Sequence, residues 1–275
     1  MIPISKKIFN VENHIARERL IGVVGGVGPE ASNKFCEFLI KNKRAGSDQD
    51  HLLFLHYCNP KIPDRTEFIL GKGEDPRPEI IRTCKILQEA GSSFLVIPCN
   101  TAHAFLKDIQ ESVDIPIVDM TKVLVKKVLE EFPPISKVGI LATTGSIKAG
   151  IYQAYFENVG VKTLLPSKKD QEELVMKAVY GINGIKAGNK TAPKKLLIKA
   201  AQKLIDQGAE ALVLGCTEIP LILKKKDLGV KLFDPMELVA QEVIEYLEQE
   251  PIEMITITYE LTRENIFQDK EVIKT

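Results

Sequence analysis

The chain has 275 residues and carries 37 basic and 37 acidic side chains, so its formal net charge is zero. A neutral chain has no overall electrostatic attraction for nucleic acid or for an anionic membrane surface, and we expect neither as a partner. No apolar run approaches the roughly 20 residues that span a bilayer, and the first 20 residues lack the apolar segment of a signal peptide.

The chain contains five cysteines, with no CxxC motif and no regular spacing. An odd number without such motifs disfavours both a metal site and a disulfide framework, so we predict no bound metal. Free thiols are typical of a reducing compartment, and we therefore expect a cytoplasmic protein.

Short apolar runs alternate with helical segments through the first half of the chain. The expected strands are 20–24, 52–56, 94–97 and 115–119, and the expected helices are 29–43, 79–90, 102–111 and 120–131. The segment 58–78 is too long and too charged for a plain connection, and such loops often carry function.

The second half repeats this order. Its expected strands are 137–141, 161–165, 211–214 and 231–234, and its expected helices are 147–159, 171–180, 192–207 and 236–248. The tail at 252–275 has no counterpart in the first half, although 256–259 alternates as an edge strand would. Strands that alternate with helices of about 10–15 residues indicate parallel βαβ units.

An internal repeat links the two halves. Cys216 lies 117 positions after Cys99, and the same shift pairs Gly22 with Gly139 and Leu95 with Leu212. Such repeats determine architecture, so we predict an α/β fold of two similar parallel-sheet domains related by pseudo-twofold symmetry. Ligands of open parallel sheets bind beyond the carboxyl ends of the strands, where both cysteines lie, and we therefore expect an active site in the cleft between the domains.

The repeat also sets the expected domain boundaries. We expect an N-terminal extension at 1–19, a first α/β domain at 20–120, a second α/β domain at 121–235 and a C-terminal extension at 251–275. The closing helix, 236–250, is expected to pack back on the first domain.

The paired cysteines are the candidate catalytic groups. A thiolate on one face of a carbon centre can remove a proton, and a thiol on the other face can return one, which is what inversion requires. Asn100, Thr101, Thr217 and Glu218 follow the two cysteines, and their polar groups suit the carboxylate of a small-molecule substrate. A free cysteine is more often a small buried hydrophobe, and Cys36, Cys58 and Cys84 keep that interpretation because the shift pairs none of them with a cysteine.

Several motifs resemble those of the aspartate/glutamate racemase family, and of its aspartate racemases in particular. The resemblance covers roughly residues 20–247. The motifs are Gly25-Gly26-Val27-Gly28-Pro29-Glu30-Ala31, Ile62-Pro63-Asp64-Arg65-Thr66, Gly71-Lys72-Gly73-Glu74-Asp75-Pro76-Arg77-Pro78, Pro98-Cys99-Asn100-Thr101-Ala102-His103, Ile185-Lys186-Ala187-Gly188-Asn189 and Gly215-Cys216-Thr217-Glu218.

The resemblance implies cofactor-independent racemisation of an amino acid, aspartate above all, with Cys99 and Cys216 as the acid/base pair. It also implies a homodimer, and it places Arg65 and Lys186 near the side-chain carboxylate of the substrate. Val27 stands where the family often has methionine, so it is expected to shape the pocket. Thr143 is added as a candidate binding residue because its loop mirrors that of Gly26.

Other interpretations remain open at this point. Glutamate or a broader set of amino acids could be the substrate, or the chain could bind an amino acid without catalysis. Residues 26–31 also fit the G-x-G-x-x-G/A pattern of a dinucleotide site, but the twin loop at 142–146 has only one glycine. Arg65 and Lys186 could instead be solvated surface cations, and His103 is more simply a helix residue held by backbone.

Overall fold

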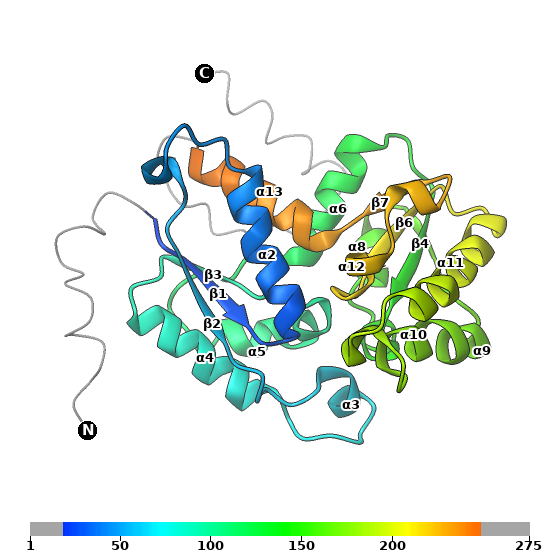
Figure 1. The fold of residues 1–275 in the computed structure, drawn as a ribbon, viewed down its shortest axis with the longest axis horizontal. Coiled ribbons are helices and arrows are strands. Elements are labelled where there is room, and N and C mark those ends of the chain that lie inside the picture. Colours follow the sequence, from blue (N-terminus) through cyan, green and yellow to red (C-terminus); the bar gives the residue numbers. More distant parts are fainter. Residues whose placement is uncertain (1–18, 249–275) are drawn as a thin grey trace. The chain divides into compact units, whose positions relative to one another are not determined.

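A computed structural model of the chain describes residues 19–248. The chain divides into two compact units, which are described separately below. Among the described residues, unit 1 consists of 19–119 and 239–248, and unit 2 consists of 120–238. Figure 1 labels most of their helices and strands. Within residues 19–248, every helix is too short or too polar to cross a membrane.

Unit 1 contains a three-stranded parallel sheet in the order β2-β1-β3. Its elements are β1 (Ile21–Gly25), α2 (Pro29–Asn42), the 3₁₀ turn η1 (Asp48–Asp50), β2 (Phe54–Cys58), α3 (Arg65–Ile69), α4 (Arg77–Glu89), β3 (Phe94–Val96), the 3₁₀ helix η2 (Asn100–Phe105) and α5 (Leu106–Gln110), with α13 (Pro235–Glu248) returning from the far end of the chain.

Alternation along the strands of unit 1 divides its apolar residues between two faces. Val24 and Leu95 share a buried cluster with residues of α4, η2 and α5. On the opposite face Phe94 meets Tyr246 of α13 edge-on, with ring centroids 6.1 Å apart. In Figure 1, α2 and α13 accordingly lie on one side of this sheet and α4 and α5 on the other.

Unit 2 contains a four-stranded parallel sheet in the order β5-β4-β6-β7. Its elements are α6 (Met120–Glu131), β4 (Lys137–Ala142), α7 (Thr144–Lys148), α8 (Gln153–Asn158), β5 (Lys162–Leu164), α9 (Lys168–Asp170), the π-helix η3 (Gln171–Met176), α10 (Lys177–Tyr180), the 3₁₀ turn η4 (Ile185–Ala187), α11 (Thr191–Asp206), β6 (Ala211–Gly215), α12 (Ile219–Ile222), the 3₁₀ turn η5 (Lys225–Asp227) and β7 (Lys231–Phe233).

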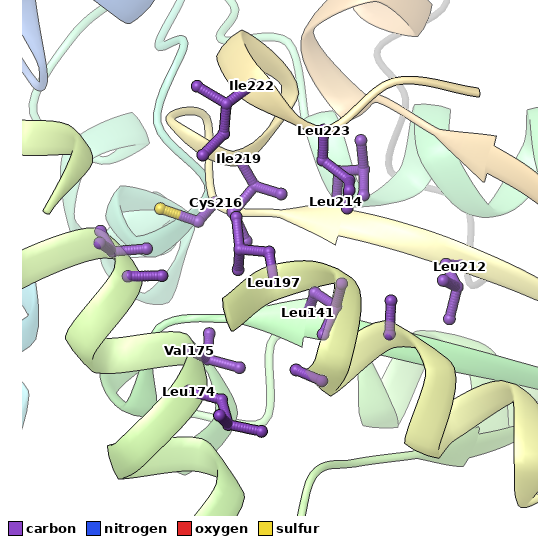
Figure 2. Close-up of a cluster of buried hydrophobic side chains, with 14 of the residues drawn as sticks. Leu141, Leu174, Val175, Leu197, Leu212, Leu214, Cys216, Ile219, Ile222 and Leu223 are labelled. Atoms are coloured by element: carbon purple, nitrogen blue, oxygen red, sulfur yellow. The ribbon is translucent and has the colours of Figure 1, made fainter. Parts of the chain in front are cut away.

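One buried apolar cluster of unit 2 lies between its sheet and the helices that follow β5. Leu141, Leu212 and Leu214 of the strands pack against apolar residues of η3, α10, α11 and α12 (Figure 2). Cys216 lies at the edge of this cluster, at the end of β6. The side chain of Cys216 therefore packs against the apolar core on this side of the sheet.

The repeat is visible in strand register. β1 pairs with β3 as Ile21↔Phe94, and β4 pairs with β6 as Val138↔Ala211, which is the same pairing 117 positions later. A Cβ atom built on Gly22 would lie 2.5 Å from Cδ2 of Leu95, and one on Gly139 would lie 2.5 Å from Cδ2 of Leu212. The predicted α/β class with two parallel sheets is confirmed. At each of the two glycines a leucine side chain occupies the space that a Cβ atom would take.

Some expected elements differ in detail. Residues 102–111 form a 3₁₀ helix followed by a short α-helix, and 115–119 makes only an isolated parallel bridge, between Leu95 and Ile117. The first six residues of the expected helix 171–180 are π-helical. The expected edge strand at 256–259, the C-terminal extension and all of the N-terminal extension except Arg19 lie outside the described residues.

The loop after β1 depends on Gly26. Its φ is +88°, and an added Cβ would lie 2.2 Å from the carbonyl carbon of Asn59. We predict that Gly26→Ala lowers the free energy of unfolding by about 3 kcal/mol, because left-handed strain and a backbone clash add together. Urea denaturation measures the change.

Gly71→Ala is the matched control, since Gly71 has φ +77° with nothing within 4 Å of an added Cβ. It should cost only about 1 kcal/mol, from strain alone. Equal losses in the two variants would contradict the close approach of Asn59.

Candidate active site

Cys99 lies beyond the carboxyl end of β3 in the sheet of unit 1. The chain leaves β3 at Val96, and Cys99 immediately precedes the first residue of η2. Its side chain is buried in the same cluster as Val27 and Ile62. The structure thus brings Val27 and Cys99, which are distant in sequence, into one apolar environment.

Polar groups follow Cys99 directly. Asn100 and Thr101 are both buried at the start of η2. The side-chain nitrogen of Asn100 is inaccessible and has no hydrogen-bond partner within the described part of the chain. An unpaired buried donor costs about 1–3 kcal/mol, so a hydrogen bond from this nitrogen to an acceptor such as a carboxylate would be favourable.

His103 holds the backbone at Cys99. Its Nδ1 lies 3.0 Å from the carbonyl oxygen of Cys99, and its Nε2 lies 3.4 Å from that of Val118. The side chain is buried, so the ring connects the start of η2 to the segment that leads out of unit 1. The interpretation of His103 as a helix residue held by backbone agrees with these contacts.

Arg65 is a buried cation of unit 1. It is the first residue of α3, and its Nη1 donates to the carbonyl oxygens of Pro63 at 3.0 Å and Ile62 at 3.4 Å. The ring of Phe68 in α3 packs on that of Phe105 in η2, with centroids 5.7 Å apart. The helix that carries Arg65 is therefore docked on the helix that begins after Cys99, and Arg65 is not a solvated surface cation.

Cys216 has a charged environment in unit 2. Its Sγ donates to Oε2 of Glu218 at 3.0 Å, and the hydroxyl of Thr217 donates to the same oxygen at 3.2 Å. The other oxygen of Glu218, Oε1, accepts a hydrogen bond from Nζ of Lys186 at 2.6 Å. The structure thus brings together four of the predicted residues, with the carboxylate of Glu218 at their centre.

These contacts shift the pKa values of Cys216 and Glu218. Burial raises the pKa of the Cys216 thiol well above its ordinary value, and the negative charge of Glu218 raises it further. Burial also acts to raise the pKa of Glu218, but the charge of Lys186 and the hydrogen bonds from Cys216 and Lys186 outweigh it, so this pKa lies below its usual value. Cys216 therefore rests as a thiol beside an ionised carboxylate.

Thr143 follows the strand beside β6. Ala142 pairs with Gly215, so Thr143 and Cys216 each follow a paired residue at the carboxyl ends of two adjacent strands. The Thr143 hydroxyl accepts a hydrogen bond from the backbone N–H of Ser146 at 3.2 Å and caps α7. The residue thus lies in a tight turn rather than in an irregular loop.

Tyr152 supports the end of β6 and carries no motif by which it could have been predicted. Its hydroxyl donates to the carbonyl oxygen of Gly215 at 2.9 Å, and its side chain is fully buried. A Cβ on Gly215 would lie 2.7 Å from that hydroxyl. The carbonyl group that precedes Cys216 is therefore bound by a buried tyrosine in addition to the sheet pairing of Gly215.

The remaining cysteines differ from the pair. Cys84 is fully buried in α4, and burial raises its pKa to about 12. Burial likewise raises the pKa of Cys36 to about 11, whereas Cys58 is exposed. All five cysteines are free thiols. Within residues 19–248, no group of three or more His, Cys, Asp or Glu side chains could hold a metal ion.

Comparison with known proteins first identifies the class, which is that of the amino-acid racemases. The solved structure of the Picrophilus torridus aspartate racemase is 27% identical to this chain, with a TM-score of 0.69 over 83% of this chain and 94% of that one. The profile of the Asp/Glu/hydantoin racemase family matches residues 24–243. The chain therefore belongs to the Asp/Glu/hydantoin racemase family, as its motifs predicted.

Individual relatives differ in their substrates. A broad specificity amino-acid racemase of Bacillus subtilis is 24% identical over 82% of this chain and 96% of its own length. A glutamate racemase of Corynebacterium glutamicum is 30% identical over 64% of this chain and 63% of its own length. Racemisation is thus shared by these relatives, but the amino acid is not.

The contact between Cys216 and Glu218 leads to a titration experiment. We predict that Glu218→Gln lowers the pKa of the Cys216 thiol, because it removes the adjacent negative charge and leaves the cation of Lys186 in place. The rate of alkylation by iodoacetamide, measured at Cys216 by peptide mass spectrometry across pH, gives the midpoint.

Glu157→Gln serves as the control, since Glu157 is exposed on α8. It should leave the midpoint where it is in the parent protein. An unchanged or higher midpoint in Glu218→Gln would show that the carboxylate does not act on the thiol.

Proposed function

We propose that the protein interconverts L- and D-aspartate without a cofactor, using Cys99 and Cys216 as the two acid/base groups. The observation that supports this most directly is the equivalence of the two cysteines. Each follows the strand that occupies the same register position in its sheet, and each begins a short polar segment. A structural role in the core would not require this pairing.

The proposed chemistry is a proton transfer on both faces of the α-carbon. The thiolate of one cysteine takes the α-proton, and the electron pair left behind spreads into the α-carboxylate. The thiol of the other cysteine then donates its proton to the opposite face, and the stereocentre is inverted. Cys216 rests as a thiol, so it is suited to donate first, with Glu218 stabilising the proton on sulfur through their hydrogen bond.

Charge that develops on the α-carboxylate needs donors that are already in place. Asn100 supplies a buried N–H₂ group without a partner among residues 19–248. The hydroxyls of Thr101 and Thr143 are candidates for the same role, and both side chains are buried. The Thr217 hydroxyl, which donates to Glu218, takes this role only if it exchanges that partner for the substrate. Preorganised donors in a buried site are worth about 3–4 kcal/mol each in transition-state stabilisation.

Arg65 is the group that favours a dicarboxylate. Its guanidinium is buried and presents a planar fork, which suits bidentate recognition of a carboxylate. Lys186 already forms an ion pair with Glu218. We therefore assign it to the charge balance around the Cys216 thiol, and not only to the second carboxylate of the substrate. The likeness to an aspartate racemase of known structure supports the same choice of substrate.

Two other functions can be distinguished from aspartate racemisation by experiment. Glutamate or a broader set of amino acids is supported by the curated relatives, and rates on a panel of amino acids separate these from aspartate. A non-catalytic amino-acid-binding protein would show affinity for an amino acid without exchange of its α-proton.

The first test follows L-aspartate in deuterated buffer without pyridoxal phosphate or metal. NMR measures loss of the α-proton, and chiral chromatography measures D-aspartate. We expect both in the parent protein, and a loss of at least about 10²-fold in racemisation for Cys99→Ser and for Cys216→Ser, because each removes one proton-transfer group.

Cys84→Ser is the control, because Cys84 is a core thiol outside the proposed mechanism. Racemisation that persists in either active-site variant would overturn the two-cysteine mechanism. Absence of exchange in the parent with aspartate, glutamate and a wider panel would overturn the enzymatic function.

Arg65 gives a separate prediction about the substrate. Arg65→Met should raise the KM for aspartate by about 10- to 100-fold, since a charge-assisted hydrogen bond to a carboxylate is worth about 1.5–3 kcal/mol. Arg65→Lys should recover only part of the loss, because lysine lacks the fork.

Steady-state kinetics measure both variants, and thermal unfolding confirms that they are folded. Arg82→Met is the matched control, as Arg82 is exposed on α4 and paired with Glu79. A KM for aspartate that Arg65→Met leaves unchanged would exclude Arg65 from binding.

A further inference from the structure

The π-helix η3 has a geometric consequence for unit 2. In an α-helix, with 3.6 residues per turn, residues 171 and 176 would point about 140° apart. In a π-helix the main-chain bonds join residues i and i+5, so residues five apart lie about one turn apart on the same side of the helix. The N–H of Lys177 donates to the carbonyl oxygen of Glu172 in this way, and Gln171 and Met176 therefore share one face.

Side chains of η3 contact the residues on either side of Thr143 at several points. Nε2 of Gln171 donates to the carbonyl oxygen of Ala142 at 2.9 Å and to Oγ1 of Thr144 at 3.2 Å. Oγ1 of Thr144 in turn donates to Oε1 of Glu172 at 2.7 Å. The N–H of Thr144 lies 3.3 Å from the sulfur of Met176. The residues on both sides of Thr143 are thus held by η3.

The orientation of the Gln171 carboxamide follows from its partners. The carbonyl oxygen of Ala142 can only accept, so the nitrogen of the carboxamide must face it. The other end, Oε1, is buried without a hydrogen-bond partner within the described part of the chain. An unpaired buried acceptor is unfavourable for stability. The favourable contribution of Gln171 therefore comes from the hydrogen bonds that its Nε2 donates.

We propose that Gln171 is a positioning residue, which places the Thr143 hydroxyl for the substrate carboxylate by bridging the two residues that flank it. The π-helix is the device that makes this possible, because it aligns Gln171 and Met176 over the same turn. This proposal rests on the proposed function for its kinetic readout. It adds a residue that no sequence motif marks.

A double-mutant cycle tests the coupling between Gln171 and Thr143. Gln171→Leu and Thr143→Ala should each lower kcat/KM for aspartate by about tenfold, and the double variant should also lose about tenfold rather than about hundredfold, because both changes remove the same placement. Independent, multiplying losses would overturn the proposal. Glu173→Gln, an exposed neighbour on η3, should have parent activity.

Gln171→Glu provides a pH profile that a purely structural role would not produce. The new carboxyl group can donate to the Ala142 carbonyl oxygen only when it is protonated, so activity relative to the parent should rise as pH falls. Thermal unfolding at each pH separates this from loss of fold. A ratio to the parent that does not change with pH, in folded protein, would overturn the proposal.

Amide hydrogen exchange tests the placement without any activity. Gln171→Leu should speed exchange at residues 143–147 while the amides of β6 stay protected as in the parent. Unchanged exchange at 143–147 would overturn the positioning role. If the parent protein does not exchange the α-proton of any amino acid, the proposed function fails. The amide hydrogen exchange at residues 143–147 still decides this inference.

Discussion

Glu218 is a buried carboxylate that must be neutralised where it lies, since an unpaired charge in a protein interior is strongly destabilising. Lys186 supplies the opposite charge, and the Cys216 thiol and the Thr217 hydroxyl satisfy the remaining acceptor sites. The ion pair therefore draws the 3₁₀ turn η4 towards the residues that follow β6. It also fixes the state of the thiol, because a thiolate beside this carboxylate would be repelled by it.

The two cysteines share a backbone setting but not an electrostatic one. The 117-residue shift pairs Thr101 with Glu218, so the same position carries a neutral hydroxyl in unit 1 and a charge in unit 2. Around Cys99 the contacts come from apolar residues such as Val27 and from the ring of His103. One difference within the repeat thus places a buried carboxylate beside Cys216, where the equivalent position beside Cys99 carries a hydroxyl.

The sequence predicted those features that depend on local pattern. Apolar runs located the strands that bear the cysteines, and the 117-residue shift agrees with the observed register, Ile21↔Phe94 and Val138↔Ala211. It could not predict Gln171, because whether residues 171–176 form an α- or a π-helix depends on tertiary contacts rather than on composition. The pairing of Lys186 with Glu218 was equally hidden, since those residues are 32 positions apart and the motif alone suggested a role for each at the substrate.

The return of α13 to unit 1 affects the order in which the chain can fold during synthesis. Within the described residues unit 2 is continuous from 120 to 238, so all four strands of its sheet are available once β7 has left the ribosome. Unit 1 begins earlier but cannot cover Phe94 until Tyr246 has been made, more than 150 residues later. The sheet that is synthesised first therefore waits for the helix that covers one of its faces until the strands of the second sheet have all been made.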